Sequence, residues 1–106
     1  MPLADYQKQM DDAVRDLETP YWMPLSQIAR LIEEVGELAR AYNHKYGDKV
    51  KKASEEPDDI AGEMGDVIFT LICLANSEGI NLDEALQRAF IKAQTRDKDR
   101  FPKKPL

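Results

Sequence analysis

The segment that most constrains the fold is Val67–Ala75, in which a single polar residue interrupts a run of apolar ones. At about 100° per residue, Phe69 and Cys73 fall on the side of a helix opposite Leu71, so apolar side chains point in nearly every direction. A helix that is apolar all round must be buried all round. A small domain cannot easily enclose one of its own helices, so we expect Phe69, Ile72 and Cys73 to form part of a subunit interface.

Three more segments have apolar residues spaced three and four apart, which is typical of amphipathic helices. They lie at about residues 3–17, at about 25–45, and from Leu82 onward. The apolar run itself belongs to a helix with Pro57 predicted in its first turn and with apolar residues from Ile60 to about Ser77. Asn81, followed three residues later by Glu84, predicts the cap of the last helix. The sequence therefore predicts an all-α fold of four helices.

The second predicted helix carries an apolar stripe, which we expect to face the core with the acidic residues on the opposite flank. The stripe consists of Leu25, Ile28, Ile32, Val35, Ala39 and Tyr42.

Two acidic motifs stand inside these apolar helices. Glu34 and Glu37 lie one helical turn apart, as do Glu63 and Asp66, and Glu33 lies beside the first pair. Like charges at this spacing weaken a helix unless a cation compensates them. No Lys or Arg occurs between residues 53 and 87, so the second pair has no basic partner on its own helix. The spacing favours a site for a hard divalent cation, and a solvated acidic face is the alternative.

Length and charge limit the class of protein. A chain of 106 residues forms one domain, and a net charge of −5 argues against a general surface for nucleic acid or anionic membranes. The apolar run is far too short to span a bilayer, and nothing at the amino terminus resembles a signal peptide. The single cysteine excludes an internal disulfide and suits a reducing compartment. We therefore expect a soluble, cytoplasmic protein in which Cys73 is a small core residue.

Two further features have two interpretations each, and two others carry a single expectation. Trp22, between two prolines, is either a structural plug or the wall of a base-binding pocket. Lys92 and Arg96 belong to a basic stripe that either binds phosphates or complements the carboxy-terminal dipole of the helix. His44, at a helix end, is expected to be incidental rather than catalytic. The polar link 49–56 is expected to be a mobile, solvated loop.

Several short sequence segments, in the same order along the chain, resemble those of the short MazG-type nucleoside triphosphate pyrophosphohydrolases, an all-α family. The resemblance covers roughly residues 20–102, which we take as the core of a single domain over 1–106, with a flexible tail at 103–106. The matching blocks are Tyr21-Trp22, Leu31 to Ala39 with the first acidic motif, Gly65-Asp66-Val67-Ile68 after Glu63, and Lys92, Thr95-Arg96-Asp97 and Arg100-Phe101-Pro102. Asp97 departs from the pattern, because the family often has Asn there.

The resemblance implies a Mg²⁺-dependent enzyme, with Mn²⁺ as a substitute, that converts a nucleoside triphosphate to the monophosphate and pyrophosphate. It implies metal ligands at Glu34, Glu37, Glu63 and Asp66, and a role for Glu33 in binding a further metal or orienting water. It assigns phosphate binding to Lys92 and Arg96. It also implies a four-helix bundle that dimerises through helix faces, as a homodimer or a dimer of dimers.

Two alternatives remain at this point. A ferritin-like di-iron protein needs Glu-x-x-His pairs, and His44 lies in neither acidic motif. A non-catalytic helical oligomer with a regulatory or scaffolding role would use the acids for a structural metal or for none.

Overall fold

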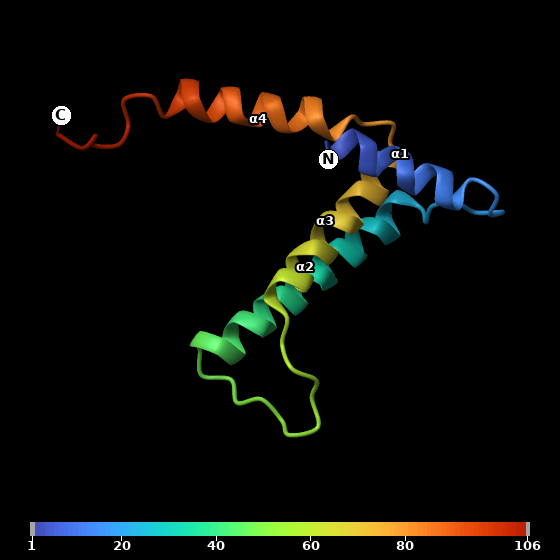
Figure 1. The fold of residues 1–106 in the computed structure, drawn as a ribbon, viewed down its shortest axis with the longest axis horizontal. Helices are drawn as coiled ribbons and strands as arrows, with labels where there is room; N and C mark the ends of the chain where they lie inside the picture. Colours follow the sequence, from blue (N-terminus) through green and yellow to red (C-terminus); the bar gives the residue numbers. More distant parts are fainter. Residues whose placement is uncertain (1, 106) are drawn as a thin grey trace.

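Four α-helices make up the fold of this protein in a computed structural model that describes residues 2–105 (Figure 1). They are α1 (Leu3–Val14), α2 (Pro24–Tyr46), α3 (Ile60–Ser77) and α4 (Leu82–Arg96). Residues 2–105 contain no strand, so the all-α prediction of four helices is confirmed. Of the predicted tail 103–106, residues 103–105 are non-helical and Leu106 lies outside the described part.

Helices α2 and α3 form an antiparallel pair, and α1 packs across the carboxy-terminal end of α3. The packing of α4 is mainly against α1, and Figure 1 shows it running away from the α2–α3 pair. The radius of gyration is 17.9 Å, whereas a compact domain of this length has about 13 Å. A single chain therefore does not close the bundle that its four helices could form.

Polar contacts fix α1 at the junction of α3 and α4. The Asp83 carboxylate accepts hydrogen bonds from the backbone N–H groups of Leu3 (3.0 Å) and Ala4 (2.9 Å), which are free donors at the start of a helix. The buried Gln7 side chain donates to Asn76 and to the carbonyl of Ile80, at 3.0 and 2.7 Å. These bonds hold together segments that lie far apart in the sequence.

Side chains cap both later helices. Asn81 Oδ1 accepts from the N–H of Glu84 at 3.2 Å, which confirms the predicted cap of α4. Helix α3 begins later than predicted, because Asp59 Oδ1 accepts from the N–H of Gly62 at 3.0 Å and makes Ile60 the first helical residue. Pro57 therefore lies before the helix rather than in its first turn.

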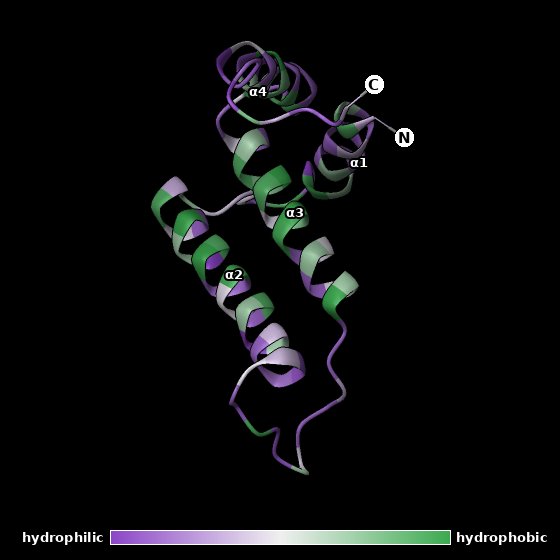
Figure 2. Cartoon of the chain, turned by 90° about the vertical axis from the view of Figure 1, so that its left-hand side faces the viewer, coloured by the Kyte–Doolittle hydropathy of each residue, from purple (hydrophilic) through white to green (hydrophobic). Residues whose placement is uncertain are grey.

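The burial pattern corrects two predictions. The α2 stripe that we assigned to the core is exposed, with Leu25 at 82% and Ile32 at 67%, while Gln27 and Ala41 are buried instead. In α3, the exposed apolar residues are Met64, Ile68, Phe69 and Leu71. Ile72 and Cys73 are buried within the chain, so of the three residues assigned to an interface only Phe69 is available. Figure 2 shows that α3 is hydrophobic along most of its length, whereas α2 carries both hydrophobic and hydrophilic residues and is hydrophilic toward its carboxy-terminal end.

Helix α3 is long and apolar enough, at 18 residues, to satisfy a length-and-composition test for a membrane span. The core helices of soluble proteins pass the same test, and α3 packs along α2 and contains Glu63 and Asp66. The test therefore does not distinguish the two cases.

Candidate active site

Three of the predicted metal ligands converge where α2 and α3 pack together. One oxygen from each of Glu34, Glu37 and Glu63 lies within 4.8 Å of the other two. Glu34 and Glu37 are one turn apart on α2, and the antiparallel packing brings the first turn of α3 beside them. Glu34 and Glu63 are partly buried, and Glu37 is exposed. This convergence of three carboxylates indicates a metal site more specifically than the spacing of acids on either helix alone does.

The acids are close enough to affect one another electrostatically. Burial raises the pKa of the Glu34 carboxyl, and the charges of Glu37 and Asp66 raise it further, against the opposing effect of Arg30. Burial, followed by the same two acids, also raises the pKa of Glu63. Asp66 therefore acts on both partly buried carboxylates, although it lies outside the tightest group. Such a cluster is destabilised when all its members are charged and no cation is bound.

The residues fit a hard divalent cation. Glu63 Oε2 is buried and has no hydrogen-bond partner within residues 2–105. A buried carboxylate oxygen is costly to leave unpaired, and a coordinated cation would satisfy it. Mg²⁺ and Mn²⁺ prefer carboxylate oxygens. Glu34, Glu37 and Glu63 would hold the ion, with Asp66 beside them.

The other predicted site residues are not part of this cluster. Glu33 is exposed and lies outside the convergent group. Lys92 and Arg96 are exposed on α4, which Figure 1 shows extending away from the part of α2 and α3 that carries the acids. The structure thus brings together the acids of one chain and does not bring the basic stripe of the same chain to them.

Trp22 lies at the wall of a cavity of about 170 Å³ between α1, the 20–22 segment, α2 and α3. The Arg30 guanidinium is 5.5 Å from the centre of the Trp22 ring and 5.8 Å from that of Phe69, within the range of cation–π contacts. The indole is 57% exposed, which does not suit a buried plug. Of the two interpretations of Trp22, the cavity wall describes its position better.

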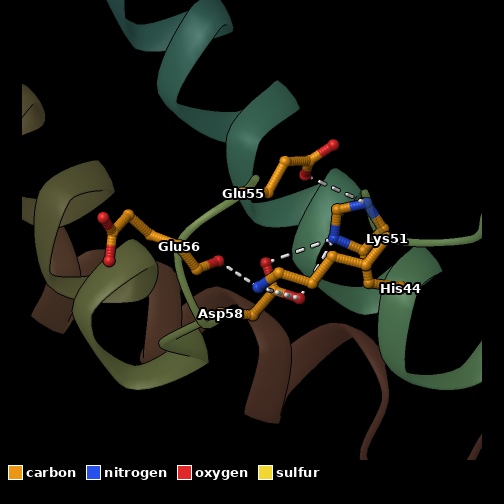
Figure 3. Close-up of polar contacts among 5 residues, drawn as sticks. All are labelled: His44, Lys51, Glu55, Glu56 and Asp58. Atoms are coloured by element: carbon orange, nitrogen blue, oxygen red, sulfur yellow. Dashed lines mark hydrogen bonds and ion pairs between the residues drawn. The ribbon is translucent and has the colours of Figure 1, made fainter. Parts of the chain in front are cut away.

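His44 is not incidental: it closes the loop between the two acidic motifs (Figure 3). Its side chain is only 2% exposed, and Nδ1 lies 3.0 and 3.2 Å from the two carboxylate oxygens of Asp58. Lys51 lies 3.6 Å from Asp58 and donates to the carbonyl of Glu56, so this part of the 49–56 loop is held rather than free. The hydrogen bond from His44 lowers the pKa of Asp58. We call His44, Lys51 and Asp58 the loop clasp.

Sequence reasoning missed Gln27, the contact of Arg30 with Trp22 and Phe69, and the pairing of Asp58 with His44. Arg30 lies one turn before Glu34, a spacing that could have placed it near the site. Gln27 and Asp58 gave no comparable signal, because their partners are distant in the sequence.

Carboxylates that converge from two antiparallel helices are typical of helical proteins that bind a divalent metal ion. Comparison with known proteins is more specific. The family model of the MazG nucleotide pyrophosphohydrolase domain matches residues 23–101. The chain is 48% identical over 102 residues to protein YpjD of Bacillus subtilis strain 168, covering 96% of this chain and 92% of YpjD. It is 31% identical over 93 residues to YvdC of the same organism, covering 82% of this chain and 88% of YvdC.

Two solved structures agree with this match. A crystal structure of Bacillus subtilis YpjD has a TM-score of 0.76 at 46% identity, covering 87% of this chain and 94% of that one. The Bacillus-conserved MazG protein, a nucleotide pyrophosphohydrolase, has a TM-score of 0.76 at 41% identity, covering 93% and 96%. The chain belongs to the MazG nucleotide pyrophosphohydrolase family. It is therefore an enzyme, and the non-catalytic alternative is set aside.

Proposed function

We propose that this protein is a Mg²⁺-dependent pyrophosphohydrolase that converts a ribo- or deoxynucleoside triphosphate and water to the monophosphate and pyrophosphate. The observation that carries the proposal is the convergence of Glu34, Glu37 and Glu63 around an unpartnered, buried Glu63 oxygen. Its cellular role would be removal of unwanted nucleotides from the cytoplasmic pool.

The acids have distinct roles in this proposal. Glu34, Glu37, Glu63 and Asp66 would hold the cation, and the exposed Glu33 would bind a further ion or orient the attacking water. Bound Mg²⁺ would screen the triphosphate and activate water. The oxygen of water forms a bond to the α-phosphorus, the bond from that phosphorus to the bridging oxygen breaks, pyrophosphate leaves, and the proton lost by the water passes to solvent. Cationic side chains near the leaving group stabilise the charge that it gathers.

We further propose that two copies of the chain build the complete site. The exposed apolar stripes of α2 and α3, together with Leu86, Phe90 and Ile91 of α4, leave more apolar surface uncovered than a stable monomer usually shows. The acids and the basic stripe of α4 are complementary in charge but lie apart within one chain. A second copy that covers the stripes could bring its Lys92 and Arg96 to the acids of the first.

Hydrolysis in ¹⁸O-labelled water tests the reaction. Label in the monophosphate and none in pyrophosphate supports attack at the α-phosphorus. Label only in pyrophosphate means attack at the β-phosphorus, and release of orthophosphate with a diphosphate means a different reaction. Any Mg²⁺-independent turnover at the full rate would remove the acids from the mechanism.

Mixing two inactive variants tests the shared site. Glu63→Gln removes a ligand and Lys92→Ala removes a phosphate contact, and each is expected to lose most activity. If acids and cations come from different copies, unfolding and refolding the two together restores activity, because a mixed dimer has one intact site. If both groups act within one copy, the mixture stays as inactive as its components.

A further inference from the structure

We propose that the Trp22 cavity binds the base of the substrate and selects cytosine, with the Gln27 side chain as the residue that determines specificity. This inference rests on the proposed function, because it assigns the base of the same nucleotide. It is carried by the hydrogen bonds of Gln27, the size of the cavity and the position of the cavity beside the acids.

The amide of Gln27 has a fixed orientation. Its side chain is buried, with 3% exposed, and Nε2 donates to the carbonyl of Trp22 at 2.9 Å and to the Ser77 hydroxyl at 3.0 Å. A carbonyl only accepts, and the Ser77 hydroxyl donates its own hydrogen to Leu74. Both amide hydrogens are therefore in use, and the atom that Gln27 can offer to a ligand in the cavity is Oε1, an acceptor.

An acceptor at this position distinguishes the pyrimidines. Cytosine carries an amino group that donates at the place where uracil and thymine carry a carbonyl that accepts. Oε1 can accept a hydrogen bond from the cytosine amino group, whereas it would face a second acceptor in uracil. The Gln27 amide cannot rotate to present its NH₂ group without breaking its bonds to Trp22 and Ser77.

The size and lining of the cavity suit one six-membered ring. Its volume is about 170 Å³, and an apolar cavity of roughly 150 Å³ holds a benzene ring. Trp22 and Phe69 provide aromatic surfaces, and Met10 and Val14 of α1 provide aliphatic ones. Aromatic side chains are the usual stacking partners of bases. The cavity is partly open to solvent, so the second ring of a purine would extend beyond these side chains instead of packing among them.

The cavity adjoins the acid cluster on two helices. Arg30 lines the cavity and lies one turn before Glu34, whose pKa it affects, and Phe69 lies one turn after Asp66. Along α2, Gln27 precedes Glu34 by seven residues, a rise of about 10 Å. A nucleotide with its base at Gln27 can therefore extend its phosphates toward the acids.

A series of substrates tests this inference without altering the protein. We expect kcat/KM for CTP to exceed that for UTP roughly tenfold, the value of about one hydrogen bond. The triphosphate of pyrimidin-2-one riboside, which lacks the 4-substituent, should fall between them, and ATP should be poorer than CTP. Equal values for CTP and UTP, or for CTP and ATP, would overturn the inference.

Binding of monophosphates separates this inference from the proposed reaction. Trp22 is the only tryptophan, so its fluorescence reports the cavity directly. CMP should quench it at lower concentration than UMP, whether or not any triphosphate is hydrolysed. If triphosphates are hydrolysed without base preference and the two monophosphates bind alike, the reaction stands and the inference fails. If CMP binds preferentially and no triphosphate is hydrolysed, the inference stands and the proposed function fails.

A matched pair of variants locates the effect at Gln27. Gln27→Leu removes the acceptor, so the ratio of CTP to UTP turnover should fall toward one, with folding checked by circular dichroism. Gln87→Leu alters an exposed glutamine on α4 and should leave the ratio unchanged. An unchanged ratio in folded Gln27→Leu would refute the assignment.

Discussion

Replacement of Glu63 by Gln should separate the stability of the protein from its response to metal. Glu63 is the ligand with the unpartnered buried oxygen, and its charge lies close to those of Glu34 and Glu37. Gln keeps the size of the side chain and removes one charge, so crowding of like charges is relieved. Without metal at pH 7.5, Glu63→Gln should therefore melt at the same temperature as the unmodified protein or higher.

Addition of metal should reverse that order. A ligand that binds only the folded state at a hundred times its Kd stabilises it by about 2.7 kcal/mol. For a domain of this size, that corresponds to a rise in Tm of roughly 10 to 20 °C. We expect this rise with Mn²⁺ or Mg²⁺ in the unmodified protein and little of it in Glu63→Gln.

Differential scanning fluorimetry, with a metal titration for each protein, measures both effects. Glu56→Gln is the matched control, since it removes an equal charge from an exposed position outside the cluster and should keep the full response. A Glu63→Gln protein that gains as much from metal as the control would refute the cation site. Loss of stability without metal would refute the argument from charge crowding.

Three other predictions concern the interface, the clasp and the basic stripe. Ile32→Glu places a charge on the exposed apolar stripe of α2, so light scattering should show a dimer converted to a monomer. Val50→Glu, in the exposed loop, is the control and should leave the dimer intact. An unmodified protein that is monomeric would contradict this prediction. His44 and Lys51 lower the pKa of Asp58, so the loop clasp should stabilise the fold at pH values above the ordinary aspartate pKa. This contribution should be lost as the pH falls through the lowered pKa. Asp58→Asn should remove the corresponding fall in melting temperature at low pH. Arg96→Ala should reduce kcat/KM for triphosphates more than it weakens Mn²⁺ binding, and equal effects would argue against a phosphate contact.

The parts of the fold that depend on local sequence could be predicted. The bounds of α2 and the end of α3 follow from apolar periodicity, and the start of α4 follows from Asn81. Pro57 was assigned wrongly to a first turn because Asp59, two residues later, caps the helix with its own side chain. Proline is tolerated at the start of a helix but does not fix where the helix starts. A carboxylate that accepts a hydrogen bond from the N–H three residues later does fix it.

The acid cluster could be predicted only in part. Spacing places Glu34 and Glu37 on one side of a helix, and it cannot state which side of that helix meets α3. We expected the acids opposite the core, and the structure places Glu34 partly buried on the packed side beside Glu63. Long-range pairs such as His44 with Asp58 depend on where the loop returns, which no local pattern encodes.

The proposed assembly of two chains would explain both the exposed α2 stripe and the position of α4, which packs on α1 and extends away from α2 and α3. Periodicity correctly identified Ile32 and Phe90 as members of apolar helix faces, yet both are exposed in a single chain. Apolar periodicity predicts that a helix face is buried, but it does not indicate whether the residues that bury it belong to the same chain or to another. The exposure of these residues, together with a radius of gyration above that of a compact domain, shows that the chain folds with these faces open. If a second copy provides it, the same contact that buries the stripes also supplies the basic residues that the acid cluster lacks, so stability and catalysis should be lost together on dilution below the dimer dissociation constant.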